Sequence, residues 1–184
     1  MTAVARRYAK AIFSLAQEEK TQEKTGAEIE TLAELGRAPE LASTLGNPLL
    51  SADARKAVAE TLALQLELAP TTANFVRLLA DKNRLDLLPG IGDFYRRLLD
   101  QAMNRTRMTV TTASRLDADQ GQTLVAAFEA ITGKTVLAET ETDAELLGGV
   151  LVEVEGKVYD GSVRMQLERL ARKIAGSQAY QPRL

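Results

Sequence analysis

The segment with the most suggestive chemistry lies between Glu145 and Ile174, where four glycines interrupt a run of valines and leucines. Glycines between a strand and a helix are how many proteins hold phosphate. A phosphate loop needs a glycine, four residues of any type, and then Gly-Lys-Ser/Thr. Here Val158 follows Gly156-Lys157, and Leu151 stands where the first glycine should be. The motif fails, so we expect no nucleotide cofactor.

Two groups of charged side chains could also hold a ligand. Four acids follow one another at a spacing of two and would share one face of a strand: Glu139, Glu141, Asp143 and Glu145. A calcium loop needs a central glycine and further ligands, so we interpret these acids as a solvated strand face and expect no metal ion. Two basic groups could contact an acidic partner segment. One consists of Arg96, Arg97, Arg105 and Arg107, and the other of Arg164, Arg169, Arg172 and Lys173.

Composition excludes several classes of site. The chain has no cysteine and no histidine, which removes Cys/His metal sites, thiol nucleophiles, serine–histidine triads and disulfides. The net charge is −2, with 13 basic and 14 acidic residues in 1–104 and 10 and 11 in 105–184. Neither half has the basic excess that a phosphate backbone attracts, so nucleic acid is not expected as a main partner. With no long apolar run and no signal-peptide pattern, we expect a cytosolic product.

The first hundred residues carry helical patterns only. Ser51 can cap a helix, Pro39 and Pro70 suit first turns, and Gly36 is expected to end a helix. Six helices are predicted, at 3–19, 22–35, 39–46, 51–62, 70–83 and 87–104. The last should turn Ile91, Phe94, Leu98 and Ala102 inward.

Period-two alternation begins after Asn104 and predicts strands. Thr106, Met108, Val110 and Thr112 form one face of the first strand, and further strands are expected at 135–142, 149–155 and 157–159. A helix capped by Asp117 and ended by Gly133 should turn Leu124, Ala127, Phe128 and Ile131 inward. A last helix, capped by Ser162, should turn one apolar stripe inward: Val163, Leu167, Leu170, Ala171 and Ile174.

The expected fold class is therefore α+β. A six-helix bundle over 1–104 is followed by a small α/β domain over 105–184 with a mixed sheet. The first two strands, joined by a helix, should be parallel.

The apolar arc of the first helix is wider than one buried face needs. It indicates either a helix buried on all sides of the bundle or a groove that receives a partner helix. For the second interpretation, Tyr8, Ala11 and Leu15 have the right spacing, and the small Ala11 would allow close approach. Asn74 and Leu78 lie one turn apart on the expected fifth helix, at a spacing that matches that of the first helix.

Three stretches resemble one family. ARRYAKAIFSLA (5–16) is similar to the opening helix of the delta subunit of bacterial F-type ATP synthase, whose mitochondrial counterpart is the oligomycin-sensitivity-conferring protein. FVRLLADKNRLDLLPGIGDFY (75–95) resembles the central segment of that family, and LLGGVLVEVEGKVYDGSVRMQLERL (146–170) resembles its C-terminal signature. The family more often has a glycine in the turn at Lys82-Asn83, but asparagine tolerates the left-handed conformation.

The resemblance implies a non-catalytic stator subunit without a cofactor. The helical domain would bind the N-terminal helix of an alpha subunit of the catalytic head, between its first and fifth helices. The second domain would receive the C-terminal end of the b subunit. The protein would lie at the cytoplasmic face of a bacterial plasma membrane, associated with the membrane only through the complex. The alternative is a generic helical adaptor or a weak nucleic-acid-binding module. The implied contacts are Tyr8, Ala11, Asn74 and Leu78, to which helical spacing adds Leu15.

Overall fold

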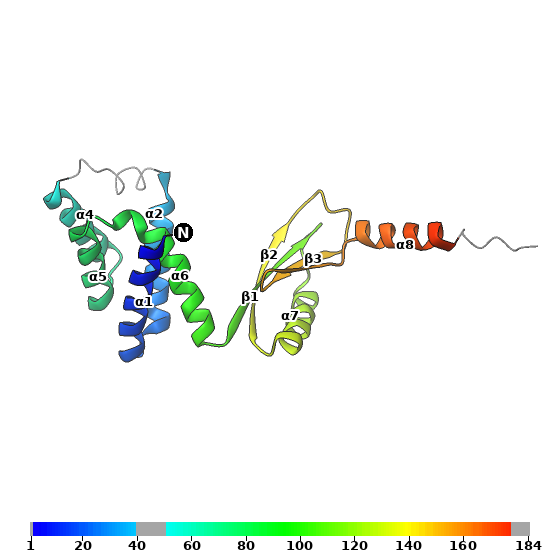
Figure 1. Ribbon diagram of the computed structural model, residues 1–184, viewed down its shortest axis with the longest axis horizontal. Helices are drawn as coiled ribbons and strands as arrows, with labels where there is room; N and C mark the ends of the chain where they lie inside the picture. The colour runs from blue at the N-terminus through cyan, green and yellow to red at the C-terminus, as the bar shows by residue number, and fades with distance from the viewer. Residues whose placement is uncertain (1, 40–50, 178–184) are drawn as a thin grey trace, which may run out of the picture. The chain divides into compact units, whose positions relative to one another are not determined.

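The structure, a computed structural model, describes residues 2–39 and 51–177. The chain divides into two compact units, Met1–Met103 and Asn104–Leu184. The first is helical, and the second contains a four-stranded sheet (Figure 1). The helix expected at 39–46 falls mostly outside the described residues, as does the tail after 177.

Five of the predicted helices are present in the described part of the first unit. Hydroxyl caps start two of them, since Thr2 accepts from the amide of Ala5 and Ser51 from the amide of Ala54. A short 3₁₀ turn, η1 (Leu85–Leu87), comes before the last helix. The helices are α1 (Ala3–Glu18), α2 (Gln22–Arg37), α4 (Ala52–Gln65), α5 (Pro70–Asp81) and α6 (Leu88–Ala102).

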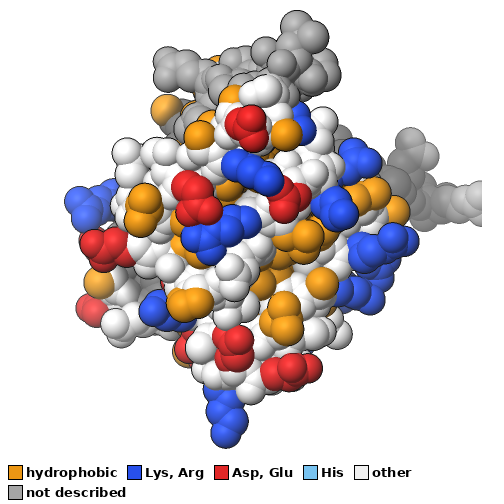
Figure 2. All heavy atoms as spheres, turned by 90° about the vertical axis from the view of Figure 1, so that its left-hand side faces the viewer, with side chains coloured by type: hydrophobic (Ala, Val, Ile, Leu, Met, Phe, Trp, Pro, Cys, Tyr) orange, Lys and Arg blue, Asp and Glu red, His pale blue; other side chains and the backbone are white. Residues whose placement is uncertain are grey.

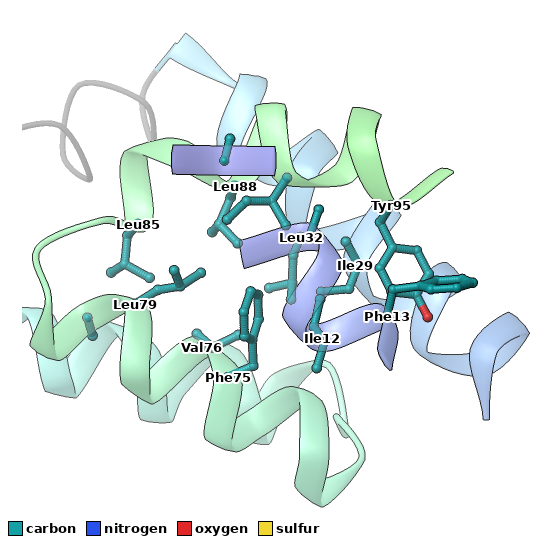
Figure 3. Close-up of a cluster of buried hydrophobic side chains, with 14 of the residues drawn as sticks. Ile12, Phe13, Ile29, Leu32, Phe75, Val76, Leu79, Leu85, Leu88 and Tyr95 are labelled. Atoms are coloured by element: carbon teal, nitrogen blue, oxygen red, sulfur yellow. The ribbon is translucent and has the colours of Figure 1, made fainter. Parts of the chain in front are cut away.

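The core of this unit draws side chains from α1, α2, α5, η1 and α6, which point toward one another in Figure 3. On α6 the prediction was partly wrong. Ile91 is buried as expected, but Ala102 is exposed and Phe94 and Leu98 are only partly buried. Tyr95, which the pattern did not single out, is buried instead.

Close packing of α2 on α6 depends on glycines. A Cβ on Gly92 would lie 2.5 Å from the Cβ of Ala33, so only glycine fits there. The prediction that Gly36 ends α2 was wrong. Gly36 is buried inside the helix, where an added Cβ would lie 3.1 Å from Cδ of Pro89 on α6. This glycine serves helix packing rather than helix termination.

The mixed sheet of the second unit is confirmed. Its strands are β1 (Arg105–Thr112), β2 (Thr135–Thr142), β3 (Val150–Val154) and β4 (Lys157–Asp160), in the order β2-β1-β3-β4. β1 and β2 are parallel, as expected, and the other pairs are antiparallel. The crossover helix α7 (Ala118–Thr132) places Phe128 on a core that contains Met108 and Val110 of β1. Gly133 ends α7 in the left-handed conformation, as predicted.

The last helix, α8 (Val163–Ser177), has the predicted cap, because Ser162 Oγ accepts from the amide of Met165 at 3.2 Å. The predicted burial of its apolar stripe was wrong. Val163, Leu167, Leu170 and Ile174 are 37%, 55%, 54% and 57% exposed, and Ala171 is exposed too. Periodicity gathers apolar residues on one stripe but does not specify what covers them. The same error applies on α7 to the exposed Ala127 and Ile131.

In 2–39 and 51–177, no helix is long and apolar enough to cross a membrane.

Candidate partner-binding surface

The apolar arc of α1 consists of two stripes with different surroundings. One stripe is buried and includes Ala9 and Ile12. The other faces solvent: Leu15 is 48% exposed, Ala11 is exposed and Tyr8 is half-buried. A helix hidden on all sides would bury both stripes, so the first interpretation of the arc does not hold. Figure 2 shows hydrophobic side chains gathered in a band on one face of the molecule, bordered by charged groups.

The structure brings α1 and α5 together. The ring of Tyr8 meets the ring of Phe75 edge to face, with 6.2 Å between centroids. Beside Phe75 on α5, Asn74 is exposed and Leu78 is 44% exposed. We call the solvent-facing side chains of the two helices the α1–α5 surface; it consists of Tyr8, Ala11, Leu15, Asn74 and Leu78.

Hydrogen bonds fix the start of α5 against α1 and α2. The carboxylate of Glu28, on α2, accepts from the amide of Ala69 at 3.2 Å and from the hydroxyl of Thr72. It thereby caps a helix whose own first residues supply no side-chain cap. The hydroxyl of Thr71 donates to Glu19, at the end of α1, at 2.8 Å. Sequence reasoning missed Glu28, because a contact across 44 residues leaves no local pattern.

Arg77 holds α5 against α4 on the other side. Its Nε and Nη2 donate to the two carboxylate oxygens of Glu60 at 2.7 and 2.9 Å, a bidentate pair. This hydrogen bonding lowers the pKa of Glu60 and raises the pKa of Arg77. The third nitrogen, Nη1, donates to Oδ1 of Asn74 at 2.9 Å. Arg77 thus orients a side chain of the α1–α5 surface, a role that sequence reasoning did not assign.

The glycines of the C-terminal segment have structural explanations. Gly149 has a φ of +83°, and a Cβ there would lie 2.4 Å from the carbonyl oxygen of Gly161. Glu155 and Gly156, both at positive φ, form the hairpin turn between β3 and β4. A hollow of about 560 Å³ lies beside Gly149, but its lining carries both Arg115 and Asp119, so it has no net charge to attract an anion.

Comparisons with known proteins agree on one family. The model of the ATP synthase delta (OSCP) subunit matches residues 4–174. The delta subunit of Anaeromyxobacter sp. (strain Fw109-5) is 42% identical over 175 residues, covering 95% of this chain and 98% of the relative. That of Syntrophobacter fumaroxidans is 40% identical over 165 residues, covering 89% and 90%.

A chain in the cryo-EM structure of the Toxoplasma gondii mitochondrial ATP synthase hexamer has a similar fold. The TM-score is 0.66 at 21% identity, covering 95% of this chain and 98% of that chain. The two-unit fold, and the family match over nearly the whole length, lead to one assignment. The chain belongs to the ATP synthase delta (OSCP) subunit family, a structural component of the peripheral stalk of that complex.

Proposed function

We propose that this subunit links the catalytic head of an F-type ATP synthase to its b-subunit stalk and resists rotation of the head during proton-driven synthesis. The helical unit, assigned to residues 1–104, binds the N-terminal helix of an alpha subunit. The unit at 105–184 binds the C-terminal end of the b subunit. The complex places it at the cytoplasmic face of a bacterial plasma membrane, and its own role is mechanical rather than catalytic.

The observation that carries the proposal is the α1–α5 surface. Leu15 and Leu78 are each nearly half exposed to solvent. They lie on two helices that are in contact through Tyr8 and Phe75. An amphipathic helix that lays its apolar face there would bury these side chains. The exposed Ala11 adds little bulk, which lets the backbone of a partner helix come close.

A stator must not release its partner under load. Nanomolar binding corresponds to about −12 kcal/mol, and a preorganised surface reaches such affinity more easily because fewer side chains lose freedom. The capping of α5 by Glu28 and its pairing with α4 through Arg77 supply that preorganisation. The Arg77 contact also reaches the surface itself, because the same guanidinium donates to Oδ1 of Asn74.

The test is a charge placed at the centre of the surface. Ala11→Asp puts a carboxylate under the docked helix, where binding must strip it of water, so we expect the affinity for the N-terminal peptide of an alpha subunit to fall by about 2–3 kcal/mol. The matched control is Ala27→Asp, the same change at an exposed position of α2. Calorimetric titration measures both. Equal affinity for Ala11→Asp and Ala27→Asp would show that the peptide binds elsewhere.

A further inference from the structure

One end of the α1–α5 surface is acidic. Glu18 and Glu19 follow Leu15 by three and four residues, and both are exposed. Residues three or four apart are neighbours on a helix, so these carboxylates border Leu15. The hydrogen bond from Thr71 to Glu19 places this end of α1 beside the start of α5.

The other end is basic. Arg7 comes four residues before Ala11 on α1, and Lys82 comes four residues after Leu78 at the end of α5; both are exposed. The helices α1 and α5 run antiparallel, because Tyr8 contacts Phe75 whereas Glu19, later on α1, contacts Thr71, earlier on α5. The N-terminal half of α1 therefore lies toward the C-terminal end of α5, where Lys82 is.

Nearby charges of opposite sign do not cancel this polarity. Asp81, beside Lys82, pairs with Lys56 of α4, with 3.6 Å between Oδ1 and Nζ. Lys20, next to Glu19, offsets one of the two carboxylates, so Glu18, Glu19 and Lys20 together keep a net negative charge. Within the described residues, Arg7, Glu18 and Lys82 form no ion pair, so their charges remain available to a partner.

The charges at the two ends of the α1–α5 surface favour one of the two directions in which a partner helix could lie. The N-terminus of a helix carries partial positive charge and its C-terminus partial negative charge. We propose that the partner helix lies antiparallel to α1, with its N-terminus beside Glu18 and Glu19 and its C-terminus beside Arg7 and Lys82. Acidic side chains in its last turns face Arg7 and Lys82. This rests on the proposed function and adds a direction and a charge pattern to it.

Paramagnetic labels test the direction, because a chain without cysteine accepts single labels. Ala3→Cys and Gln17→Cys place a nitroxide at exposed positions near either end of α1, roughly 21 Å apart at 1.5 Å per residue. The probe is the isotope-labelled N-terminal peptide of the alpha subunit from the same organism. The Gln17→Cys label should broaden signals of the N-terminal half of the peptide, and the Ala3→Cys label those of its C-terminal half.

The reversed pattern, or one without a gradient, overturns the proposed direction while leaving the proposed function in place. A peptide that does not bind the unlabelled chain at all overturns both.

Reversing the charge of Arg7 tests the proposed charge pattern. Arg7→Glu should weaken peptide binding about five-fold at low salt, and the loss should shrink as salt is added. Arg6→Glu is the matched control, since it changes the net charge equally at an exposed position away from the apolar stripe; it should cost less than about two-fold. Equal losses for the two variants overturn the assigned charge pattern.

Discussion

Tyr95 joins three elements of the helical unit through one side chain. It is 1% exposed, its ring meets that of Phe13 on α1 edge to face at 5.4 Å, and its hydroxyl donates to the carbonyl of Gln22 on α2 at 2.9 Å. The carbonyl of a first-turn residue also accepts within its own helix, so Gln22 keeps a partner without the hydroxyl. Burial raises the pKa of Tyr95 to about 12.

That pKa makes stability fall at alkaline pH. An unfolded tyrosine loses its proton near pH 10, whereas folded Tyr95 keeps it until about pH 12. Its stabilisation is complete below pH 10 and is lost as the pH rises through 12, by up to roughly 3 kcal/mol. Tyr95→Phe should cost about 1 kcal/mol at neutral pH and remove this alkaline loss. Urea unfolding across the pH range measures it, with the more exposed Tyr159→Phe as control. An alkaline loss that persists in Tyr95→Phe would contradict the assignment.

Sequence patterns predicted the elements better than their surroundings. The alternation from Thr106 to Thr112 gave the buried face of β1 correctly, and Asn83 adopts the left-handed turn expected of it, with a φ of +55°. Gly36 was misinterpreted because a glycine that ends a helix and one that lets another helix approach look alike in sequence. The exposed stripe of α8 and the cap from Glu28 could not be predicted either, because both depend on what lies nearby in space.

Within the unit at 105–184, we propose the exposed apolar stripe of α8 as the contact for the b subunit. Leu167→Asp replaces a side chain that is already 55% exposed, so the free energy of unfolding should change by no more than about 0.5 kcal/mol. Binding of a peptide from the C-terminal end of the b subunit should weaken at least ten-fold, because an unpaired charge enters the contact. Leu64→Asp, at a 76% exposed position of α4, is the control. If Leu167→Asp binds this peptide with unchanged affinity, the stalk contact lies elsewhere.

At the scale of the whole molecule, two compact units are joined in sequence at Met103 and Asn104. The proposed function needs each unit to hold its own partner at the same time, because a link between head and stalk transmits torque only while both of its ends are bound. The α1–α5 surface and the α8 stripe belong to different units, so a change in one should leave binding at the other intact.

The most direct measurement is therefore assembly of the full chain with two peptides, followed by analytical ultracentrifugation. One peptide is the N-terminal segment of the alpha subunit, and the other comes from the C-terminal end of the b subunit. The account predicts a complex that contains all three components. Ala11→Asp should lose only the alpha peptide, and Leu167→Asp only the b peptide. Mutually exclusive binding of the two partners, or loss of the same partner in both variants, would contradict a link between head and stalk.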